Sequence, residues 1–436
     1  MDRVQSRILW LLGSLLFVFF CLYAVWSYSL TDPNLVLSSW QPYWSAQQWL
    51  WQTLYHNPQL QANLYAGLMA AIWLLYGSIL YRLHTSFSTQ KMQGKHWLII
   101  AVVLAPLFFA YNALSHDIFN YIFNAKMVVV YGANPHVQTA LNFASDPWVR
   151  FMHNTHTTAP YGYGWTVLSV VPLMLGMGKF LLTWLLYKVA AMFSLVLLGL
   201  SANWFSNSVM KQPLSWFQAA LLFLNPLLVI EVLGNGHNDL WMLVPALLAV
   251  GVGLQWGTRK IALLLGLLVW SISIKYATLV LLPLFIAILY TENVWERIRS
   301  RLVIRLPLKL IVPIAEKFFG EVVRKNVVGV SAATASLLLF LPLLTSRSQQ
   351  FHPWYLIWAL VWIPFISVKF VRVLLIAFSI SSSFRYVPWV VAGGFEAGTL
   401  TQQQAITWIG GMTLMLLWYA VSSMQLRRSH TGLRKL

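Results

Sequence analysis

Apolar runs long enough to cross a lipid bilayer recur along the whole chain, and they limit its fold more than any other feature. Examples are residues 8–28, 62–83, 97–111 and 327–344. A transmembrane helix needs about 20 predominantly apolar residues. Only 9% of the 436 residues are charged, against roughly 25% in soluble domains. We therefore predict an all-α polytopic membrane protein of about 11–13 spans, forming a single domain over residues 1–436.

The net charge of +18 comes from basic residues that gather in a few short segments between the apolar runs. Lys and Arg collect in cytoplasmic loops, so this charge predicts topology and contact with an anionic inner leaflet, and it does not indicate nucleic-acid binding. Placing all basic segments on one side puts both termini in the cytoplasm. The segments hold Arg3 and Arg7; Arg82, Lys91 and Lys95; Lys211; Arg259 and Lys260; Lys369 and Arg372; and the C-terminal Arg427, Arg428, Arg434 and Lys435.

The longest basic segment, residues 291–326, has eight Lys and Arg against four Glu. Arg301, Arg305 and Lys309 follow one another at four-residue spacing among apolar residues. This spacing places the three cations on one face of a helix. We expect a cytoplasmic amphipathic helix that lies on the inner leaflet.

The segments left for the opposite side are poor in basic residues. Residues 29–61 contain no Lys or Arg, and residues 115–164 form a long loop that is rich in His, Tyr and Asn. We expect short external helices beside the membrane there. Residues 165–205 predict one full span, about residues 179–203, preceded by a short external or re-entrant helix.

Acidic residues are rare, so each one outside the cytoplasmic side is a candidate functional group. A polar or ionised side chain near the bilayer is costly. If a carboxylate acts as a base on the external side, it is one of six. These are Asp32, Asp117, Asp146, Glu231, Asp239 and Glu396.

Asp117 follows the third apolar run and begins a predicted helix that ends at Gly132. Asp117, Tyr121 and Ala125 would share one face of this helix. The helix dipole favours an anion in the first turn, so Asp117 is either a simple cap or a positioned base. His116 beside it is a candidate metal ligand or a hydrogen-bonding partner.

A glycine-rich external turn, Gly234-Asn-Gly-His-Asn-Asp239, holds three further polar candidates. His237, Asn238 and Asp239 could bind a phosphate, a sugar or a metal. Asp is also a favourable N-cap, so Asp239 could simply begin the next helix. The sequence leaves both interpretations open.

Two more external sites carry polar and aromatic residues. Lys275 and Tyr276 lie in a predicted helix break at residues 271–276, which would bring Lys275 to the external face, although a lysine can also reach the surface by snorkelling. His352 precedes Trp354 and Tyr355 at the start of another span. The aromatic pair is typical of an interfacial belt, and His352 is a candidate phosphate or sugar contact.

These motifs follow one another in a recognisable order over about residues 110–360. They are Ser115-His-Asp117-x3-Tyr121, Gly132-Ala-Asn134-Pro135, Thr158-Ala-Pro-Tyr161-Gly162, Asn225-Pro, His237-Asn-Asp239, Lys275-Tyr276…Pro283 and His352-Pro-Trp354-Tyr355. The order resembles the GT-C mannosyltransferases that use polyprenyl-phosphate mannose. It is most similar to the actinobacterial α-1,6-mannopyranosyltransferases, and more loosely to the catalytic subunit of the first GPI mannosyltransferase.

The chain departs from that family's usual pattern at three positions. His136 follows Pro135 where the family usually has Tyr, and Tyr163 follows Gly162 where it often has Pro. His116 stands beside Asp117 where many GT-C enzymes have a second carboxylate. The sequence assigns no metal ligand, and it leaves open whether a divalent cation binds at this loop.

The resemblance implies a GT-C type helix bundle and an inverting sugar transfer at the external face of a bacterial plasma membrane. A polyprenyl-phosphate sugar, most simply mannose, would be the donor, and a glycan or glycolipid the acceptor. Asp117 in the 115–164 catalytic loop would be the base, and Lys275, with His237 or His352, would offset the charge of the leaving phosphate. The substrate-binding residues would be His116, Tyr121, Asn134, Tyr161, His237, Asn238, Asp239, Lys275, Tyr276, His352, Trp354 and Tyr355.

Two other functions fit a polytopic protein. A transporter or flippase of lipid-linked sugars would favour inverted repeats and helices broken at the midplane. We find no repeat in the sequence, and the polar motifs cluster on the external side. A structural membrane scaffold would leave the positions of Asp117 and Lys275 without a purpose.

Overall fold

The computed structural model describes residues 3–32, 36–290, 312–345, 352–393 and 397–432. Within these ranges the chain is helical and has no strand, apart from one isolated bridge between Lys91 and Ser215. The prediction of an all-α polytopic membrane protein is confirmed. Residues 291–311 of the predicted amphipathic segment lie outside the described residues.

The number of full-length spans is lower than the sequence predicts. In the described ranges seven helices are long and apolar enough to cross a membrane, or eight if a bent pair counts as one span. Three more apolar helices have only 10–17 residues. The prediction of about 11–13 spans counted such short helices as full crossings, although a crossing takes about 20 residues. The seven are Val4–Leu30, Pro58–Phe87, Phe180–Val209, Asp239–Ile274, Asn326–Leu344, Lys369–Ala392 and Gly398–Ser423. One of these ranges, Asp239–Ile274, contains two helices that pack along each other, so it is a hairpin and not a single straight span.

The N-terminal part of the bundle is built from helices that pack side by side. α1 (Arg3–Ser27) packs along α3 (Pro58–Phe87) and α4 (Gly94–Phe108). Asn57 caps α3 by accepting a hydrogen bond from the backbone N–H of Leu60 at 3.1 Å, and Pro58 occupies the first turn, where it removes no needed donor. The short α2 (Gln41–Leu50) lies in the predicted external segment 29–61.

Residues 163–204 form two helices, as the sequence predicts. The short α6 (Tyr163–Leu175) is followed by the long α7 (Phe180–Trp204), and the chain turns between them at Gly178, which has a φ of +72°. Only glycine adopts that backbone conformation readily. The interpretation of one span with a short helix before it is therefore confirmed.

The C-terminal part of the bundle starts with α13 (Val312–Phe340) and the short α14 (Leu356–Leu360). α15 (Lys369–Phe384) packs along α18 (Gly411–Gly432). The remaining two helices are α16 (Tyr386–Ala392), which packs on α3, and α17 (Ala397–Ala405). One buried apolar cluster runs from Leu9 in α1 to Val390 in α16, so both parts of the chain share a core.

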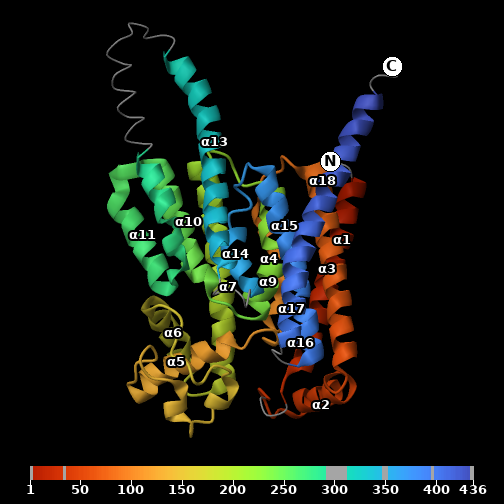
Figure 1. The fold of residues 1–436 in the computed structure, drawn as a ribbon, viewed down its shortest axis with the longest axis vertical. Coiled ribbons are helices and arrows are strands. Elements are labelled where there is room, and N and C mark those ends of the chain that lie inside the picture. Colours follow the sequence, from red (N-terminus) through yellow and green to blue (C-terminus); the bar gives the residue numbers. More distant parts are fainter. Residues whose placement is uncertain (1–2, 33–35, 291–311, 346–351, 394–396, 433–436) are drawn as a thin grey trace.

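Different elements lie at the two ends of the bundle (Figure 1). α1 begins and α18 ends at the same end of the molecule, and α2, α5 (Asp117–Tyr131) and α6 gather at the opposite end. The segment 115–164 lies there with a small apolar cluster of its own, which includes Phe123, Met127 and Met152. This arrangement places the segment 115–164 at the end opposite to the start of α1 and the end of α18.

Lys188 of α7 connects neighbouring segments of the bundle through hydrogen bonds. The ammonium group of Lys188 donates hydrogen bonds to the carbonyl oxygens of Leu233, of Gly234 at 2.7 Å and of Leu107 at 3.5 Å. These carbonyls lie at or near helix ends, where backbone oxygens lack a partner within the helix. Lys188 therefore caps the ends of two neighbouring segments, a role that no local sequence pattern indicates.

Candidate functional site

A helical hairpin brings Asp239 and Lys275 together from 36 positions apart in the sequence. α10 (Asp239–Trp256) and α11 (Ile261–Ile274) pack along each other, joined by a turn at Gly257. Asp239 therefore begins one helix where the other ends, and Lys275 Nζ lies 2.7 Å from Asp239 Oδ1. The helix dipoles favour an anion at the first position and a cation at the second.

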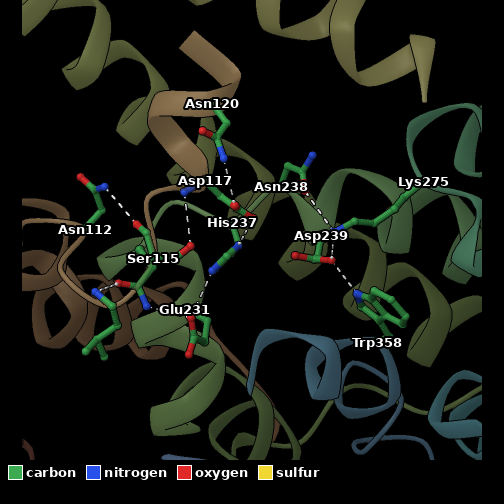
Figure 2. Close-up of polar contacts among 12 residues, drawn as sticks. Asn112, Ser115, Asp117, Asn120, Glu231, His237, Asn238, Asp239, Lys275 and Trp358 are labelled. Atoms are coloured by element: carbon green, nitrogen blue, oxygen red, sulfur yellow. Dashed lines mark hydrogen bonds and ion pairs between the residues drawn. The ribbon is translucent and has the colours of Figure 1, made fainter. Parts of the chain in front are cut away.

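Asp239 does more than begin a helix, because its Oδ1 atom has two side-chain partners. It is fully buried, and Trp358 Nε1 donates a hydrogen bond to Asp239 Oδ1 at 2.5 Å. Asn238 Oδ1 lies 3.5 Å from Lys275 Nζ on the other side. Asp239 thus orients the ammonium group of Lys275, and Figure 2 shows these contacts.

The preceding turn is formed by a broken helix. α8 (Trp216–Phe223) and α9 (Pro226–Val229) meet at a bend of 53°, where Asn225 caps α9, and a π-helical turn (Ile230–Gly234) follows. Gly236 then has a φ of +77°, and a side chain there would meet Ile118 at 2.9 Å. The turn therefore requires glycine, and it directs His237 toward α5.

Asp117 begins α5 and lies close to this turn. Ser115 Oγ accepts a hydrogen bond from the backbone N–H of Asp117 at 3.3 Å, and Asn120 Nδ2 donates to Asp117 Oδ1 at 3.5 Å. His237 Nδ1 lies 3.6 Å from Asp117 Oδ2. The Asp117 side chain keeps 19% of its surface exposed, so it can reach a bound molecule.

A cavity of about 410 Å³ lies against these elements. It joins the first turns of α5 to the segment 152–161, to the start of the Tyr276–Tyr290 helix and to residues 352–358. Seven of the thirteen residues predicted from sequence line it. These are Asp117, Tyr161, Lys275, Tyr276, His352, Trp354 and Tyr355.

The helical face that α5 presents to the cavity differs from the predicted one. Asp117, Asn120 and Asn124 line the cavity, so the face follows the i, i+3, i+7 spacing and excludes Tyr121 and Ala125. Tyr121 is buried, with its ring 5.0 Å from that of Tyr161. The structure therefore places Tyr121 behind Tyr161 and not in the cavity lining.

Tyr161 reaches the cavity because the next residue has no side chain. A Cβ atom on Gly162 would lie 2.0 Å from the carbonyl oxygen of Ser273, and the Gly162 N–H donates to the carbonyl of Ile274 at 2.9 Å. Burial, and then the charge of Asp117, raise the pKa of Tyr161 well above its ordinary value. Tyr161 is therefore a neutral hydrogen-bond donor beside Asp117.

Five other predicted residues lie behind the cavity wall or away from it. His237, Asn238 and Asp239 form the layer beneath the lining residues. His116 is turned away from the cavity and stacks on His153 at 3.6 Å, and burial lowers its pKa to about 3. Asn134 is exposed and accepts a hydrogen bond from the backbone N–H of His136 at 2.9 Å, so the structure does not bring it to the site.

His352, Trp354 and Tyr355 form one edge of the cavity. The ring of Trp354 stacks on His352 at 4.3 Å and on His237 at 4.2 Å. Burial, with Arg385 and the neighbouring His237 and Lys275, lowers the pKa of His352 to about 3. His352 is therefore neutral near pH 7 and can offer a hydrogen bond to a ligand, but no charge.

Sequence reasoning listed Glu231 among six carboxylates and did not select it. Glu231 is fully buried; Tyr386 Oη donates to its Oε1 at 2.8 Å, and Asn235 Nδ2 donates to its Oε2 at 2.8 Å. His237 Nε2 lies 3.4 Å from the same Oε2. The sequence does contain a feature that could have identified Glu231. It is a carboxylate inside the apolar run Leu227–Leu233, where a charge without a function is costly.

The comparisons with known proteins decide the family. The family model described as alpha-(1->6)-mannopyranosyltransferase, N-terminal domain, matches residues 13–291. This chain belongs to that family. It is a glycosyltransferase of mannose, it works on a sugar donor and a glycan acceptor, and it is an integral multi-pass membrane protein. No curated protein and no solved structure matched the chain.

The match covers most of the site of this mannosyltransferase. Asp117, Glu231, His237, Asp239 and Lys275 all fall within residues 13–291. The cavity edge at residues 352–358 lies beyond the match. Among the described residues no group of three or more His, Cys, Asp and Glu side chains is placed to hold a metal ion.

Proposed function

We propose that this mannosyltransferase moves mannose, with inversion, from a polyprenyl-phosphate donor to a hydroxyl group of a glycan or glycolipid acceptor on the external face of a bacterial plasma membrane. One observation carries the proposal. Asp117 and the ammonium group of Lys275 line the same cavity of about 410 Å³, at the end of the bundle opposite to both termini.

The two charged groups suit the two ends of the reacting bond. The acceptor oxygen attacks C1 of the mannose while its proton passes to the carboxylate of Asp117. The bond between C1 and the phosphate oxygen breaks, and the phosphate monoester leaves with the electron pair. A base within hydrogen-bond reach contributes about 10²–10⁴-fold to such a rate.

Lys275 would bind the leaving phosphate. Its ammonium group has three donors and uses Asp239 Oδ1, at 2.7 Å, as one partner, so donors remain for a phosphate oxygen. Because Asp239 already holds it, little side-chain entropy is lost when the donor binds. The neutral ring of His352 and the hydroxyl of Tyr161 can add uncharged hydrogen bonds.

The walls of the cavity suit a molecule with a polar head and a lipid tail. Asn120, Asn124, Thr157 and Thr158 supply hydroxyl and amide groups. On another side the cavity meets Pro342 and Leu343, at the end of the apolar helix Asn326–Leu344. A donor whose chain stays in the bilayer would present its sugar at this point.

The test is product analysis with the purified protein in vesicles. We expect polyprenyl-phosphate mannose, labelled in the sugar, to yield a new α-linked mannoside and free polyprenyl phosphate, and a nucleotide-linked mannose to yield nothing. Transfer from the nucleotide sugar alone would contradict the proposed donor. Movement of the labelled lipid across the vesicle without a new glycosidic bond would favour a transporter.

A further inference from the structure

Asp117 is the outer member of a chain of three titratable side chains that runs inward from the cavity. His237 Nδ1 lies 3.6 Å from Asp117 Oδ2, and His237 Nε2 lies 3.4 Å from Glu231 Oε2 (Figure 2). The side chains of His237 and Glu231 are fully buried, and the Asp117 side chain is 19% exposed. The imidazole thus stands between one carboxylate that faces the cavity and one that does not.

We propose that Glu231 and His237 are positioning residues that form a proton relay behind the base Asp117. This proposal rests on the function proposed above. Glu231 holds the tautomer of His237 that carries its proton on Nε2, which leaves Nδ1 free toward Asp117. The arrangement follows the logic of a nucleophile–histidine–carboxylate triad, in which the buried carboxylate orients the ring and stabilises the imidazolium that forms.

The proton balance of the relay is simple. During transfer the acceptor hydroxyl gives its proton to Asp117. That proton then moves to His237 Nδ1, so that Asp117 becomes a carboxylate again and His237 becomes an imidazolium beside the anionic Glu231. When the products leave, the proton returns through Asp117 to water in the cavity.

Glu231 is itself held in place from three further elements. Tyr386 of α16 donates to Oε1, and Asn235 donates to Oε2 while its own Oδ1 accepts from the N–H of Leu114 at 3.3 Å. The hydroxyl groups of Tyr23 in α1 and Tyr65 in α3 lie within electrostatic range of the same carboxylate. These contacts fix the Glu231 side chain. The hydrogen bond between Asn235 and Leu114 also connects Glu231 to the segment that leads into α5.

Other groups around His237 set the electrostatic environment of its ring. Asp117 from α5 and Glu231 from the π-helical turn face its two nitrogens. Trp354 stacks on the ring, and His352 acts on it electrostatically. Because the pKa of His352 is about 3, His352 carries no charge near pH 7. The carboxylates of Asp117 and Glu231 therefore dominate the electrostatic environment of His237.

The test compares Glu231→Gln with the unaltered enzyme in single-turnover and steady-state assays. The amide can present its N–H to His237 and so favour the wrong tautomer. We expect kcat to fall by about 10²–10⁴-fold, with KM for the donor unchanged. Loss of the neighbouring negative charge disfavours the imidazolium, so the acidic limb of the kcat profile should move to lower pH.

Two further variants keep the test decisive if Glu231→Gln is poorly folded. His237→Gln should lower kcat at least as much and abolish the acidic limb that belongs to the imidazole. Asp146→Asn is the matched control, because Asp146 is a buried carboxylate of the external lobe, 2.6 Å from Lys126 and outside the cavity. It should lower thermal stability and leave the acidic limb of kcat in place.

The outcomes separate the relay from the proposed function. If the unaltered enzyme gives no product from polyprenyl-phosphate mannose, the proposed function fails. If it gives product, and the folded Glu231→Gln or His237→Gln variant keeps both the kcat and the acidic limb of the unaltered enzyme, the relay is overturned. A fall in kcat with no movement of the limb in either variant would also overturn it, because that result indicates a structural role alone.

Discussion

At the scale of single residues, the pair Asp239–Lys275 is the most sensitive to change. Asp239 is fully buried, and the Lys275 side chain keeps 14% of its surface exposed to the cavity. Removing one partner of a buried ion pair leaves an uncompensated charge and costs about 3–5 kcal/mol. The cost should be unequal here, since Lys275 can reach water and Asp239 cannot.

We therefore predict that Lys275→Met destabilises the protein by about 3–5 kcal/mol, and that Asp239→Asn costs less. The double variant Asp239→Asn/Lys275→Met should be more stable than Lys275→Met alone, because it leaves no buried charge. Thermal melting of the purified variants, read as a double-mutant cycle, measures this. Additive losses would show that the two side chains do not interact.

Acidification should destabilise the folded protein through two histidines. The pKa values of His116 and His352 are lowered to about 3, chiefly by burial, whereas an unfolded histidine titrates near pH 6.5. The unfolded chain therefore binds protons first, so the stability present above pH 6.5 is lost as the pH falls toward 3. The melting temperature should fall over this window, and His116→Asn should make the fall shallower. A melting temperature independent of pH would contradict the assignment of two buried neutral rings.

At this scale the sequence selects residues by type, and the structure shows how those residues are arranged. Asp117 and Lys275 were selected because charges near a bilayer are costly, and both line the cavity. Glu231 met the same criterion, but its partners Tyr386 and Asn235 lie 155 and 4 positions away, and no local pattern connects all three. Helical spacing predicts that Tyr121 shares a face with Asp117. Periodicity shows which residues share a face, but it does not show which face points toward the cavity.

At the scale of helices, the close contact of α6 with α11 shapes the cavity. Gly162 lies against the backbone of Ser273, and a Cβ atom there would be 2.0 Å from its carbonyl oxygen. Since backbone atoms cannot rotate away, a larger residue must separate the two helices. The two residues next to this contact, Tyr161 and Lys275, both line the cavity.

We predict that Gly162→Ala lowers kcat/KM by about 10²-fold, because it moves Tyr161 relative to Lys275. Gly266→Ala is the matched control, since Gly266 lies in α11 with open space around it; there alanine should be neutral or stabilise the helix by up to about 1 kcal/mol. Steady-state kinetics of both variants checks this. Unimpaired activity of Gly162→Ala would mean that the contact does not set the geometry of the site.

Some helix boundaries were predictable from the local sequence, and helix pairing was not. The turn at Gly178 and the break before Tyr276 follow from local sequence. The hairpin of α10 and α11 depends on packing of two apolar helices of low amphipathicity, so no stripe of polar residues reveals which faces meet. Asp239 and Lys275 are 36 positions apart, so their contact could be found only from the structure.

At the scale of the whole molecule, the proposed external reaction depends on the orientation of the chain in the membrane. The lobe formed by residues 115–164, which contains Asp117 at the start of α5, lies opposite to the end where α1 begins and α18 ends (Figure 1). The distribution of Lys and Arg predicts that the terminal end is cytoplasmic. The fold class and the division into two ends were thus predictable from composition, whereas the number of full spans was not.

Labelling of single cysteines measures this orientation directly. With Cys21, the one cysteine of the chain, replaced by alanine, we expect Val137→Cys in the external lobe to react with a membrane-impermeant maleimide on intact cells. Val137 is 71% exposed. Lys95→Cys, at the start of α4, should react only after the membrane is opened. The reverse pattern would place the cavity in the cytoplasm and contradict the external reaction.

The central claim is that Asp117 takes the proton of the acceptor hydroxyl, and single-turnover transfer by Asp117→Asn measures it most directly. Enzyme in excess over labelled polyprenyl-phosphate mannose should bind the donor as tightly as the unaltered protein and melt at a similar temperature. The rate of mannoside formation should fall by about 10²–10⁴-fold. Transfer at the unaltered rate, with donor binding intact, would show that another group is the base.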